Sequence, residues 1–365
     1  MQHLLTLALN SDIFDLAHHP HERMGVGYPL GIHLRELDLT NCRLRKIENI
    51  DHLVNLEKLC LRQNLITKFE GLKTLVKLQH LDLYDNHIKK IDVVTELNPL
   101  INLRILDLSF NKLHHIPCTI VKVASPDASN ANSATVSTTT SVITGTLTLP
   151  NLEELYLVNN KIKAIEPQTL QNLPKLRILE LGSNRIRVIE NLEPVAATLK
   201  ELWLGNNKIA EIKNLHTLTG LTRLSLQANR ITTIVNLDAL TQLQELFLSE
   251  NGITQLREEG ADQQQGCFHT MVNLKILDLS ANQLIKLEDL SSNLQSIEEL
   301  WLNDNKIDNY RQLEHLQCYK TLYSIYLQGN PIYSDGQYKR KMLFMLPQLQ
   351  QIDGFNIDKS KLLMQ

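Results

Sequence analysis

A pattern of apolar residues that returns about every 22 residues constrains this sequence more than any other feature. Residues 221–240, LTRLSLQANRITTIVNLDAL, follow the spacing LxxLxLxxNxIxxIxxLxxL, and the pattern starts again at Leu243. Its ninth position is asparagine in every copy except the first, where Cys42 stands. Such self-similarity predicts a repeat architecture in which each unit packs only against its neighbours. Twelve starts of the pattern occur, at Leu34, Leu56, Leu78, Leu103, Leu152, Leu176, Leu199, Leu221, Leu243, Leu274, Ile297 and Leu322.

The pattern predicts an α/β leucine-rich-repeat solenoid with a parallel β-sheet along its concave side. Alternate residues of a strand point to opposite faces, so Leu224 and Leu226 should enter the core while Arg223 and Ser225 face outward. The asparagine after each strand should bond to backbone groups that the turn leaves open, in its own repeat and the next. About ten residues remain to return along the convex side, enough for short turns, 3₁₀ helix or extended chain.

The repeats divide the chain into a solenoid and two ends. We predict an N-terminal tail and cap at 1–33, a solenoid at 34–330 and a C-terminal cap at 331–365. The Ser/Thr-rich stretch 118–149 predicts a flexible insertion, because its composition is poor in core-forming residues. A second interruption, at 258–270, predicts a lengthened turn.

A short amphipathic helix is expected within the C-terminal cap. From Asp335 to Leu346 the apolar residues Tyr338, Met342 and Met345 have helical spacing, and Pro347 follows. Such a helix would cover the last leucine layer, which would otherwise be exposed.

Composition excludes several classes of function. The net charge of −3 is nearly neutral, and the five cysteines form no CxxC pair, so neither a zinc site nor a disulfide framework is expected. No segment has the ~20 apolar residues of a membrane span. We find no phosphate-binding loop and no nucleophile motif, and therefore predict no enzyme, no catalytic residue, no metal and no cofactor.

The outward strand positions are acidic and aromatic. Acidic residues far outnumber basic ones there, since only Lys58, Arg62 and Arg223 are basic. This excess argues against nucleic acid, whose phosphates require Lys and Arg. Five aromatic residues share the position between the two strand leucines, and such a row predicts a protein-binding surface. Ring stacking between adjacent strands is the structural alternative. These aromatic residues are Tyr156, Trp203, Phe247, Trp301 and Tyr326.

The 22-residue step, the twelve repeats and the end segment GNPIYSDGQYKRKMLFMLPQLQQID resemble the leucine-rich-repeat regulatory subunits of protein phosphatase 1 (the regulatory subunit 7 family). The resemblance covers residues 34–358, except for the insertion. It implies that acidic and aromatic residues of the concave face bind the phosphatase catalytic subunit. By repeat position, these residues are Asp107, Tyr156, Glu180, Trp203, Asp278, Glu299, Trp301 and Tyr326, and the aromatic row adds Phe247.

The resemblance implies a non-catalytic regulator of phosphatase maturation, location or substrate choice, acting in nucleus and cytoplasm. A further phosphatase inhibitor protein is a possible third component, and we expect the free chain to be monomeric. The alternative is a leucine-rich-repeat scaffold for another basic partner, cytoskeletal or spliceosomal.

Overall fold

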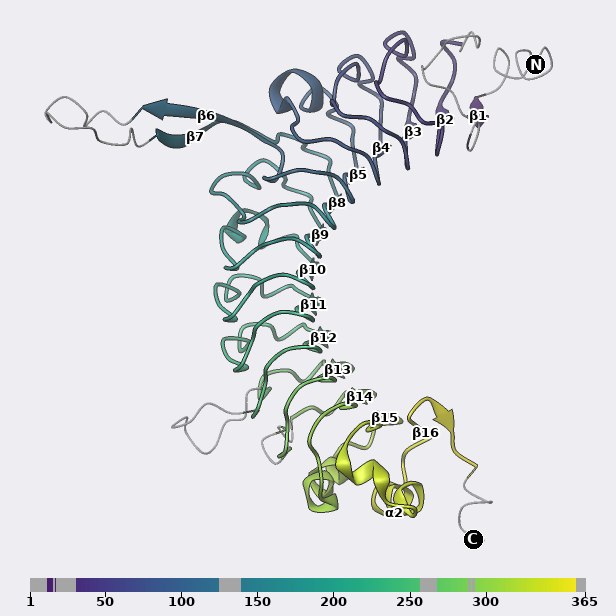
Figure 1. Cartoon of the computed structure of the whole chain (residues 1–365), viewed down its shortest axis with the longest axis vertical. Helices are drawn as coiled ribbons and strands as arrows, with labels where there is room; N and C mark the ends of the chain where they lie inside the picture. The colour runs from purple at the N-terminus through teal and green to yellow at the C-terminus, as the bar shows by residue number, and fades with distance from the viewer. Residues whose placement is uncertain are drawn as a thin grey trace, which may run out of the picture. The chain divides into compact units, whose positions relative to one another are not determined.

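The computed structural model describes residues 12–15, 17, 31–124, 139–256, 268–287, 290 and 293–358. Within these residues the chain forms two compact units, Met1–Leu176 and Arg177–Gln365. Each is a coil of repeats whose short strands lie along one side, with turns on the opposite side (Figure 1). The fold class is therefore the predicted solenoid, with a parallel sheet and few helices.

In the first unit, strands lie in the order β1-β2-β3-β4-β5-β8, all parallel. β1 falls within the predicted N-terminal cap and pairs with the first repeat, so the sheet begins earlier than the repeat pattern does. One π-helical turn, η1, lies on the return path. The bounds are β1 Ile13–Asp15, β2 Glu36–Asp38, β3 Lys58–Cys60, β4 His80–Asp82, η1 Val93–Leu97, β5 Ile105–Asp107 and β8 Glu154–Tyr156.

In the second unit, strands β9 to β16 follow one another in parallel. The return segments of the described residues are mostly turns with the 3₁₀ helices η2, η3 and η4, as the length of the repeat predicts. The bounds are β9 Ile178–Glu180, η2 Glu193–Val195, β10 Glu201–Trp203, β11 Arg223–Ser225, β12 Glu245–Phe247, β13 Ile276–Asp278, β14 Glu299–Trp301, η3 Tyr310–Cys318, β15 Ser324–Tyr326, η4 Pro331–Ser334, α2 Tyr338–Met345, β16 Gln351–Ile352 and β17 Phe355–Asn356.

The leucines of the pattern form the core. Leu224 and Leu226 have no exposed surface, and their counterparts in the other repeats are at most 5% exposed. Each repeat thus buries a layer of side chains against its neighbours, at about 25 cal/mol per Å² of apolar surface. The strands stack without slippage because a one-residue shift would turn these leucines out of the core.

The asparagine position forms a ladder of buried amides. Asn64 donates from Nδ2 to the carbonyls of Leu61 and Leu39, over 3.0 and 2.8 Å, and its Oδ1 accepts from the N–H of Leu44 over 2.9 Å. Leu39 and Leu44 belong to the preceding repeat. The asparagine therefore joins its own repeat to the previous one, whereas the sequence suggested the next.

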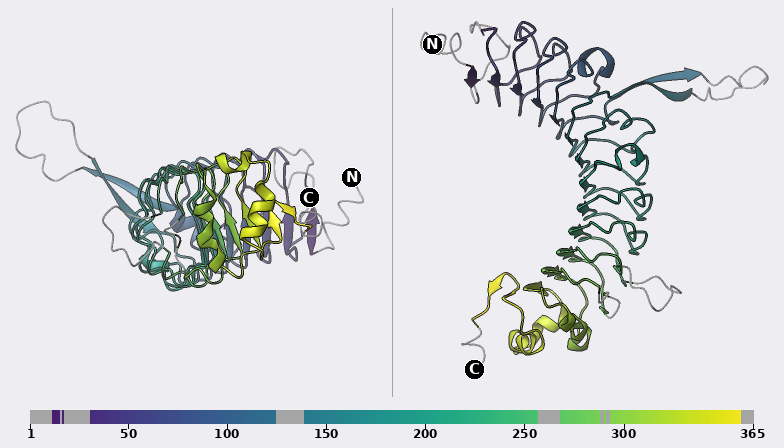
Figure 2. Two further views of the ribbon diagram at one scale, coloured as in Figure 1. Left: turned by 90° about the horizontal axis from the view of Figure 1, so that it is seen from below. Right: turned by 180° about the vertical axis from the view of Figure 1, so that it is seen from behind.

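The two ends of the insertion form strands, which the sequence analysis did not predict. β6 (Cys118–Ala124) and β7 (Thr139–Thr146) pair antiparallel as a hairpin that points away from the coil of the first unit in both figures (Figures 1 and 2). Its stem is therefore regular β-structure. The central part of the insertion, and all of the predicted 258–270 turn except 268–270, lie outside the described residues.

The sheet continues past the predicted end of the solenoid. β16 pairs in parallel with β15, and β17 folds back on β16 antiparallel. α2 lies within the segment expected to be helical, and its Tyr338 and Met342 side chains are buried. The edge of β15 is thus occupied by a short strand pair, while a covering role for the helix stays a prediction.

Candidate functional site

The candidate site is the strand face, which we define as the side chains at the third and fifth positions of each repeat, opposite the leucine core. In the second unit, parallel register brings each of these positions into line with its counterparts. The third position runs Ile178, Glu201, Arg223, Glu245, Ile276, Glu299 and Ser324. The fifth runs Glu180, Trp203, Ser225, Phe247, Asp278, Trp301 and Tyr326.

Four aromatic rings of the fifth row touch in series. Trp203 and Phe247 stack at a centroid distance of 6.2 Å, Phe247 meets Trp301 edge-on at 6.4 Å, and Trp301 meets Tyr326 edge-on at 5.5 Å. All four are half-buried. Such contacts add about 0.5–1.5 kcal/mol per pair and hold the rings in fixed positions. The four rings thus pack against one another and also leave part of their surface accessible to a partner.

The first two contacts skip a strand. Ser225 separates Trp203 from Phe247 in register, and Asp278 separates Phe247 from Trp301. Both intervening side chains are short and buried, with 1% and 5% of their surfaces exposed. Since neighbouring strands are only ~4.8 Å apart, these short residues leave room for the large rings on either side, whereas Trp301 and Tyr326, on adjacent strands, fit by meeting edge-on.

Glutamates of the third row orient the tryptophans. Nε1 of Trp203 donates to Oε2 of Glu201, and Nε1 of Trp301 donates to Oε2 of Glu299, each over 3.1 Å. Glu299 also accepts from the hydroxyl of Tyr323 over 2.7 Å, and that bond raises the pKa of Tyr323 to about 12. Residues two apart on a strand share a face, so each glutamate can restrain the ring that follows it.

One basic residue divides the acidic row. Arg223 donates from Nε and Nη2 to both carboxylate oxygens of Glu245 over 2.6 Å, and from Nη1 to Glu201 over 3.1 Å. Its guanidinium also lies 5.3 Å from the centroid of the Trp203 ring. The planar fork of arginine suits this arrangement. Arg223 therefore neutralises part of the negative charge at the centre of the strand face in the second unit. Trp203 contacts both Glu201, through its Nε1, and the Arg223 guanidinium.

Aspartates of the fifth row have a different role. Oδ1 of Asp278 accepts from the N–H of Ser280 over 2.9 Å and from its hydroxyl over 2.5 Å. Oδ1 of Asp107 likewise accepts from the N–H of Ser109 over 2.8 Å, and burial raises the pKa of Asp107. A carboxylate bonded to the backbone two residues later stabilises the turn after the strand. Part of the acidic excess is therefore structural, which composition alone does not reveal.

Near the C-terminal end of the strand face lies an open hollow of about 730 Å³. Trp301, Tyr326 and Tyr333 supply rings, while Asp278 and Asp304 supply carboxylates. A partner's ammonium or guanidinium group could meet ring faces and opposite charge together in such a setting. No cluster of three His, Cys, Asp or Glu side chains suited to a metal occurs in the described part of the chain.

Gly329 is required beside this hollow. Its φ is +80°, a conformation that L side chains rarely adopt, and a Cβ built there would lie 2.1 Å from Oδ1 of Asp304. The glycine thus lets the turn after β15 approach the Asp304 carboxylate closely.

The first unit holds the other two predicted contact residues. Asp107 on β5 and Tyr156 on β8 are partners in register, and the Tyr156 hydroxyl donates to Glu154 over 2.8 Å. Nearby, the rings of Tyr84 and Phe110 lie 4.8 Å apart. This unit repeats the combination of acidic and aromatic side chains.

All predicted site residues lie on strands of the strand face. The structure brings Asp278, Trp301 and Tyr326 together at the hollow, with Glu299 hydrogen-bonded to Trp301. Sequence reasoning missed Tyr333, which follows the last complete repeat and belongs to no row. It also missed the restraining role of Arg223, although an isolated base in an acidic row was a usable signal.

Comparisons with known proteins agree with the fold. Family profiles described as leucine rich repeats match residues 32–74, 102–122, 140–192 and 197–240. A solved structure, an internalin (InlF) of Listeria monocytogenes, superposes with a TM-score of 0.60 at 26% identity, covering 88% of this chain and 87% of that one. The fold and the profiles define a leucine-rich-repeat protein.

Two relatives have more specific names. The chain is 57% identical over 51 residues to protein phosphatase 1 regulatory subunit pprA of Dictyostelium discoideum, covering 14% of this chain and 15% of pprA. It is 35% identical over 195 residues to the protein phosphatase 1 regulatory inhibitor subunit PPP1R7 homolog of Arabidopsis thaliana, covering 53% of this chain and 50% of that protein. The chain thus spans half or less of the length of these relatives. It is a leucine-rich-repeat protein with homologues named as phosphatase 1 regulatory subunits.

Proposed function

We propose that the chain is a non-catalytic regulatory subunit that binds the catalytic subunit of protein phosphatase 1 through its strand face. The names of the relatives support this role, and the chemistry of the strand face fits a basic, partly apolar partner surface. The regulator would direct phosphatase maturation, location or substrate choice in nucleus and cytoplasm. It would be monomeric when free, and a phosphatase inhibitor protein could join the complex.

The observation that carries this proposal is the group around the hollow. Trp301 and Tyr326 form an edge-on pair, and the Trp301 indole is bonded to Glu299. Asp278 and Asp304 place two carboxylates beside the rings. Preorganised aromatic side chains bind at low entropic cost, because their rotamers are already fixed before the partner arrives. A carboxylate near each ring selects a basic partner residue.

The proposed contact residues are Asp107 and Tyr156 in the first unit, and Glu180, Trp203, Phe247, Asp278, Glu299, Trp301 and Tyr326 in the second. We expect these residues to differ in their contribution to the binding free energy. The half-buried rings should provide most of the affinity, since interface energy concentrates in few aromatic residues. The carboxylates should contribute to orientation and to the rate of association.

Calorimetric titration of the purified chain with the phosphatase catalytic subunit tests the proposal. We expect tight binding by the wild type and loss of most of it in the Trp203→Ala/Trp301→Ala double variant, with folding verified by circular dichroism. An Ile285→Ala variant, which shortens an exposed apolar side chain outside the strand rows, is the matched control and should bind normally.

Two results would redirect the interpretation. Binding that survives in the double variant would keep the partner but move the contact away from the strand face. An absence of binding would favour the alternative, a scaffold for another basic protein. Affinity capture with the wild-type chain and with the double variant would then show which proteins depend on the two tryptophans.

A further inference from the structure

The C-terminal end of the second unit has a surface whose chemistry is opposite to that of the strand face. α2 exposes Lys339, Arg340 and Lys341 in its first half and Phe344 in its second. Phe344 is 89% exposed, and Phe355 on β17 is 65% exposed. We call these five residues the α2 surface. Single exposed phenylalanines are common, but two of them beside three cations form a combination typical of binding surfaces.

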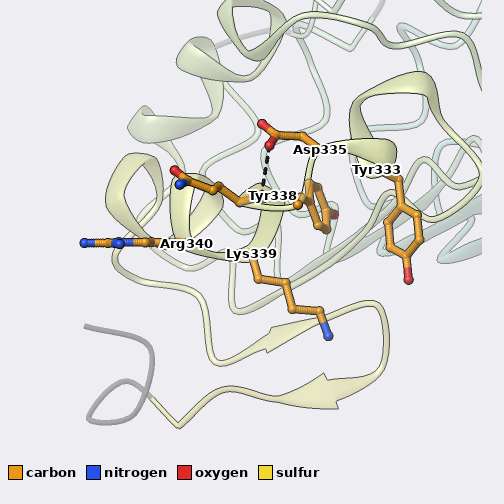
Figure 3. Close-up of a pocket in the computed structure, with 7 residues that line it drawn as sticks. Tyr333, Asp335, Tyr338, Lys339 and Arg340 are labelled. Atoms are coloured by element: carbon orange, nitrogen blue, oxygen red, sulfur yellow. Dashed lines mark hydrogen bonds between the residues drawn. The ribbon is translucent and has the colours of Figure 1, made fainter. Parts of the chain in front are cut away.

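The cations of the α2 surface are not all neutralised. Lys341 is bound by Asp335, with Nζ and Oδ2 2.6 Å apart. Nζ of Lys339 lies 4.7 Å from the centroid of the Phe355 ring, and Lys339 forms no ion pair with a carboxylate among the residues that the structure describes. Arg340 extends away from the protein in Figure 3. On a helix, residues four apart share a face, so Arg340 and Phe344 are presented together.

A hollow of about 490 Å³ adjoins these cations. The rings of Tyr333 and Tyr338, which lie 5.3 Å apart at 60°, contribute to its wall (Figure 3). The other lining residues are Asp335, Gly336, Gln337, Lys339 and Arg340. A Cβ added to Gly336 would meet no atom within 4 Å, so the space beside this residue is open. The hollow therefore combines two aromatic rings with the cations Lys339 and Arg340, and its one carboxylate, Asp335, is paired with Lys341.

We propose that the α2 surface is a docking site for an acidic segment of a partner protein. Its carboxylates would pair with Lys339 and Arg340, and one large apolar side chain would enter the hollow beside Tyr333 or pack on Phe344. The chain's own last residues do not suit this surface, because they carry Lys359 and Lys361. In a second copy, Glu201 and Glu245 are already bound to Arg223 and are not available to this surface. This inference does not depend on the phosphatase proposal.

Fluorescence polarisation with a defined peptide tests the inference. The probe is a labelled nine-residue peptide with one phenylalanine between four acidic residues on each side. Its negative charge also disfavours the acidic strand face. We expect a Kd of about 10–100 μM at low salt. The Lys339→Ala/Arg340→Ala variant should bind at least ~10-fold more weakly, and Phe344→Ser several-fold more weakly.

The controls match charge and composition. Arg185→Ala/Arg187→Ala removes the same charge from two exposed residues elsewhere in the second unit, and its affinity should stay within about twofold of the wild type. A peptide with every acid replaced by its amide should bind far more weakly.

Four results would overturn the inference: no binding at 1 mM peptide, wild-type affinity in the α2 variant, equal losses in both double variants, or equal binding of the amide peptide. Analytical ultracentrifugation of the chain alone tests whether a second copy of the chain occupies the α2 surface. A dimer that disappears in the Lys339→Ala/Arg340→Ala variant would assign the α2 surface to a second copy instead.

Discussion

The indole Nε1 of Trp301 donates a hydrogen bond to Oε2 of Glu299 over 3.1 Å, two positions earlier on the same strand. The same relationship joins Trp203 to Glu201. The orientation of each tryptophan is therefore restrained by a glutamate on its own strand. Both side chains are half-buried, so part of each ring is accessible to a partner. This arrangement makes the two tryptophans rigid anchors rather than mobile surface residues.

The first prediction compares an anchor with a peripheral acid. Trp301→Ala should weaken phosphatase binding by about 2 kcal/mol or more, because it empties a desolvated contact. Glu36→Ala, in the first unit, should change mainly the association rate and its salt dependence, since this carboxylate is 44% exposed. Stopped-flow association at two salt concentrations, together with calorimetry, separates these effects. Equal losses of affinity at both residues would contradict the anchor model.

The second prediction concerns the Arg223 bridge. Arg223→Met should lower the free energy of unfolding by about 1–2 kcal/mol, because Glu201 and Glu245 are partly buried and lose their shared cation. Lys213→Met is the control, since its ion pair with Glu211 is solvent-exposed and should contribute about 0–0.5 kcal/mol.

A double-mutant cycle completes the Arg223 test. In a Glu245→Gln background, the same Arg223→Met change should cost clearly less, as expected for residues in direct contact. Urea unfolding followed by circular dichroism provides the measurement. An identical cost in both backgrounds would show that packing, rather than the ion pair, explains the loss.

The third prediction tests the asparagine ladder. Asn282 is 7% exposed, donates to the carbonyls of Leu248 and Leu279, and accepts from the N–H of Ile253. Asn282→Ala should destabilise the chain by about 2–4 kcal/mol, because several buried backbone groups lose their partner at once.

A half-buried asparagine whose side-chain hydrogen bond is solvent-exposed provides the control for the ladder. Asn273 makes one hydrogen bond, to the carbonyl of Thr241 over 2.8 Å, and Asn273→Ala should cost about 0.5–1 kcal/mol. Thermal and urea unfolding of both variants give the comparison. A similar small loss in each would mean that water replaces the ladder bonds.

The fourth prediction is a pH dependence. Hydrogen bonds from Lys341, the N–H of Gln337 and Tyr310 lower the pKa of Asp335 to about 2. Its pKa in the unfolded chain is about 3.9, so the unfolded state binds the proton first as the pH falls. The stability from this carboxylate is therefore present above pH ~4 and is lost between pH ~4 and ~2.

Thermal unfolding from pH 7 to 2.5 checks this dependence. Asp335→Asn should be less stable than wild type at pH 7, and the difference should shrink as the pH approaches 2. The exposed Asp308→Asn variant is the control. A constant difference between wild type and Asp335→Asn at all pH values would argue against linkage at Asp335.

Sequence reasoning succeeded where a residue's environment follows from its place in the repeat. Leu224 is buried and Trp203 lies on the strand face because a strand alternates sides, whatever the neighbouring strands carry. It failed where two non-adjacent repeats meet: the Trp203–Phe247 contact depends on the small Ser225 between them. It also did not predict the β6–β7 hairpin at the ends of the insertion, because the two strands pair through backbone groups, which Ser/Thr-rich composition does not describe.

The sequence by itself determined the solenoid, the strands, the position of the buried asparagines and the residues of the strand face, because one repeating pattern dictates burial in every layer. The structure showed that the asparagine bonds to the preceding repeat, as Asn64 does. Only the tertiary structure decided which contacts those residues make. In it, Asp278 accepts a hydrogen bond from the turn after its strand, Arg223 bridges Glu201 and Glu245, and Tyr333 lines the hollow beside Trp301. The physical reason is that burial follows a residue's own repeat position, whereas charge pairing, ring contacts and hollows depend on the side chains that neighbouring layers bring within a few ångströms.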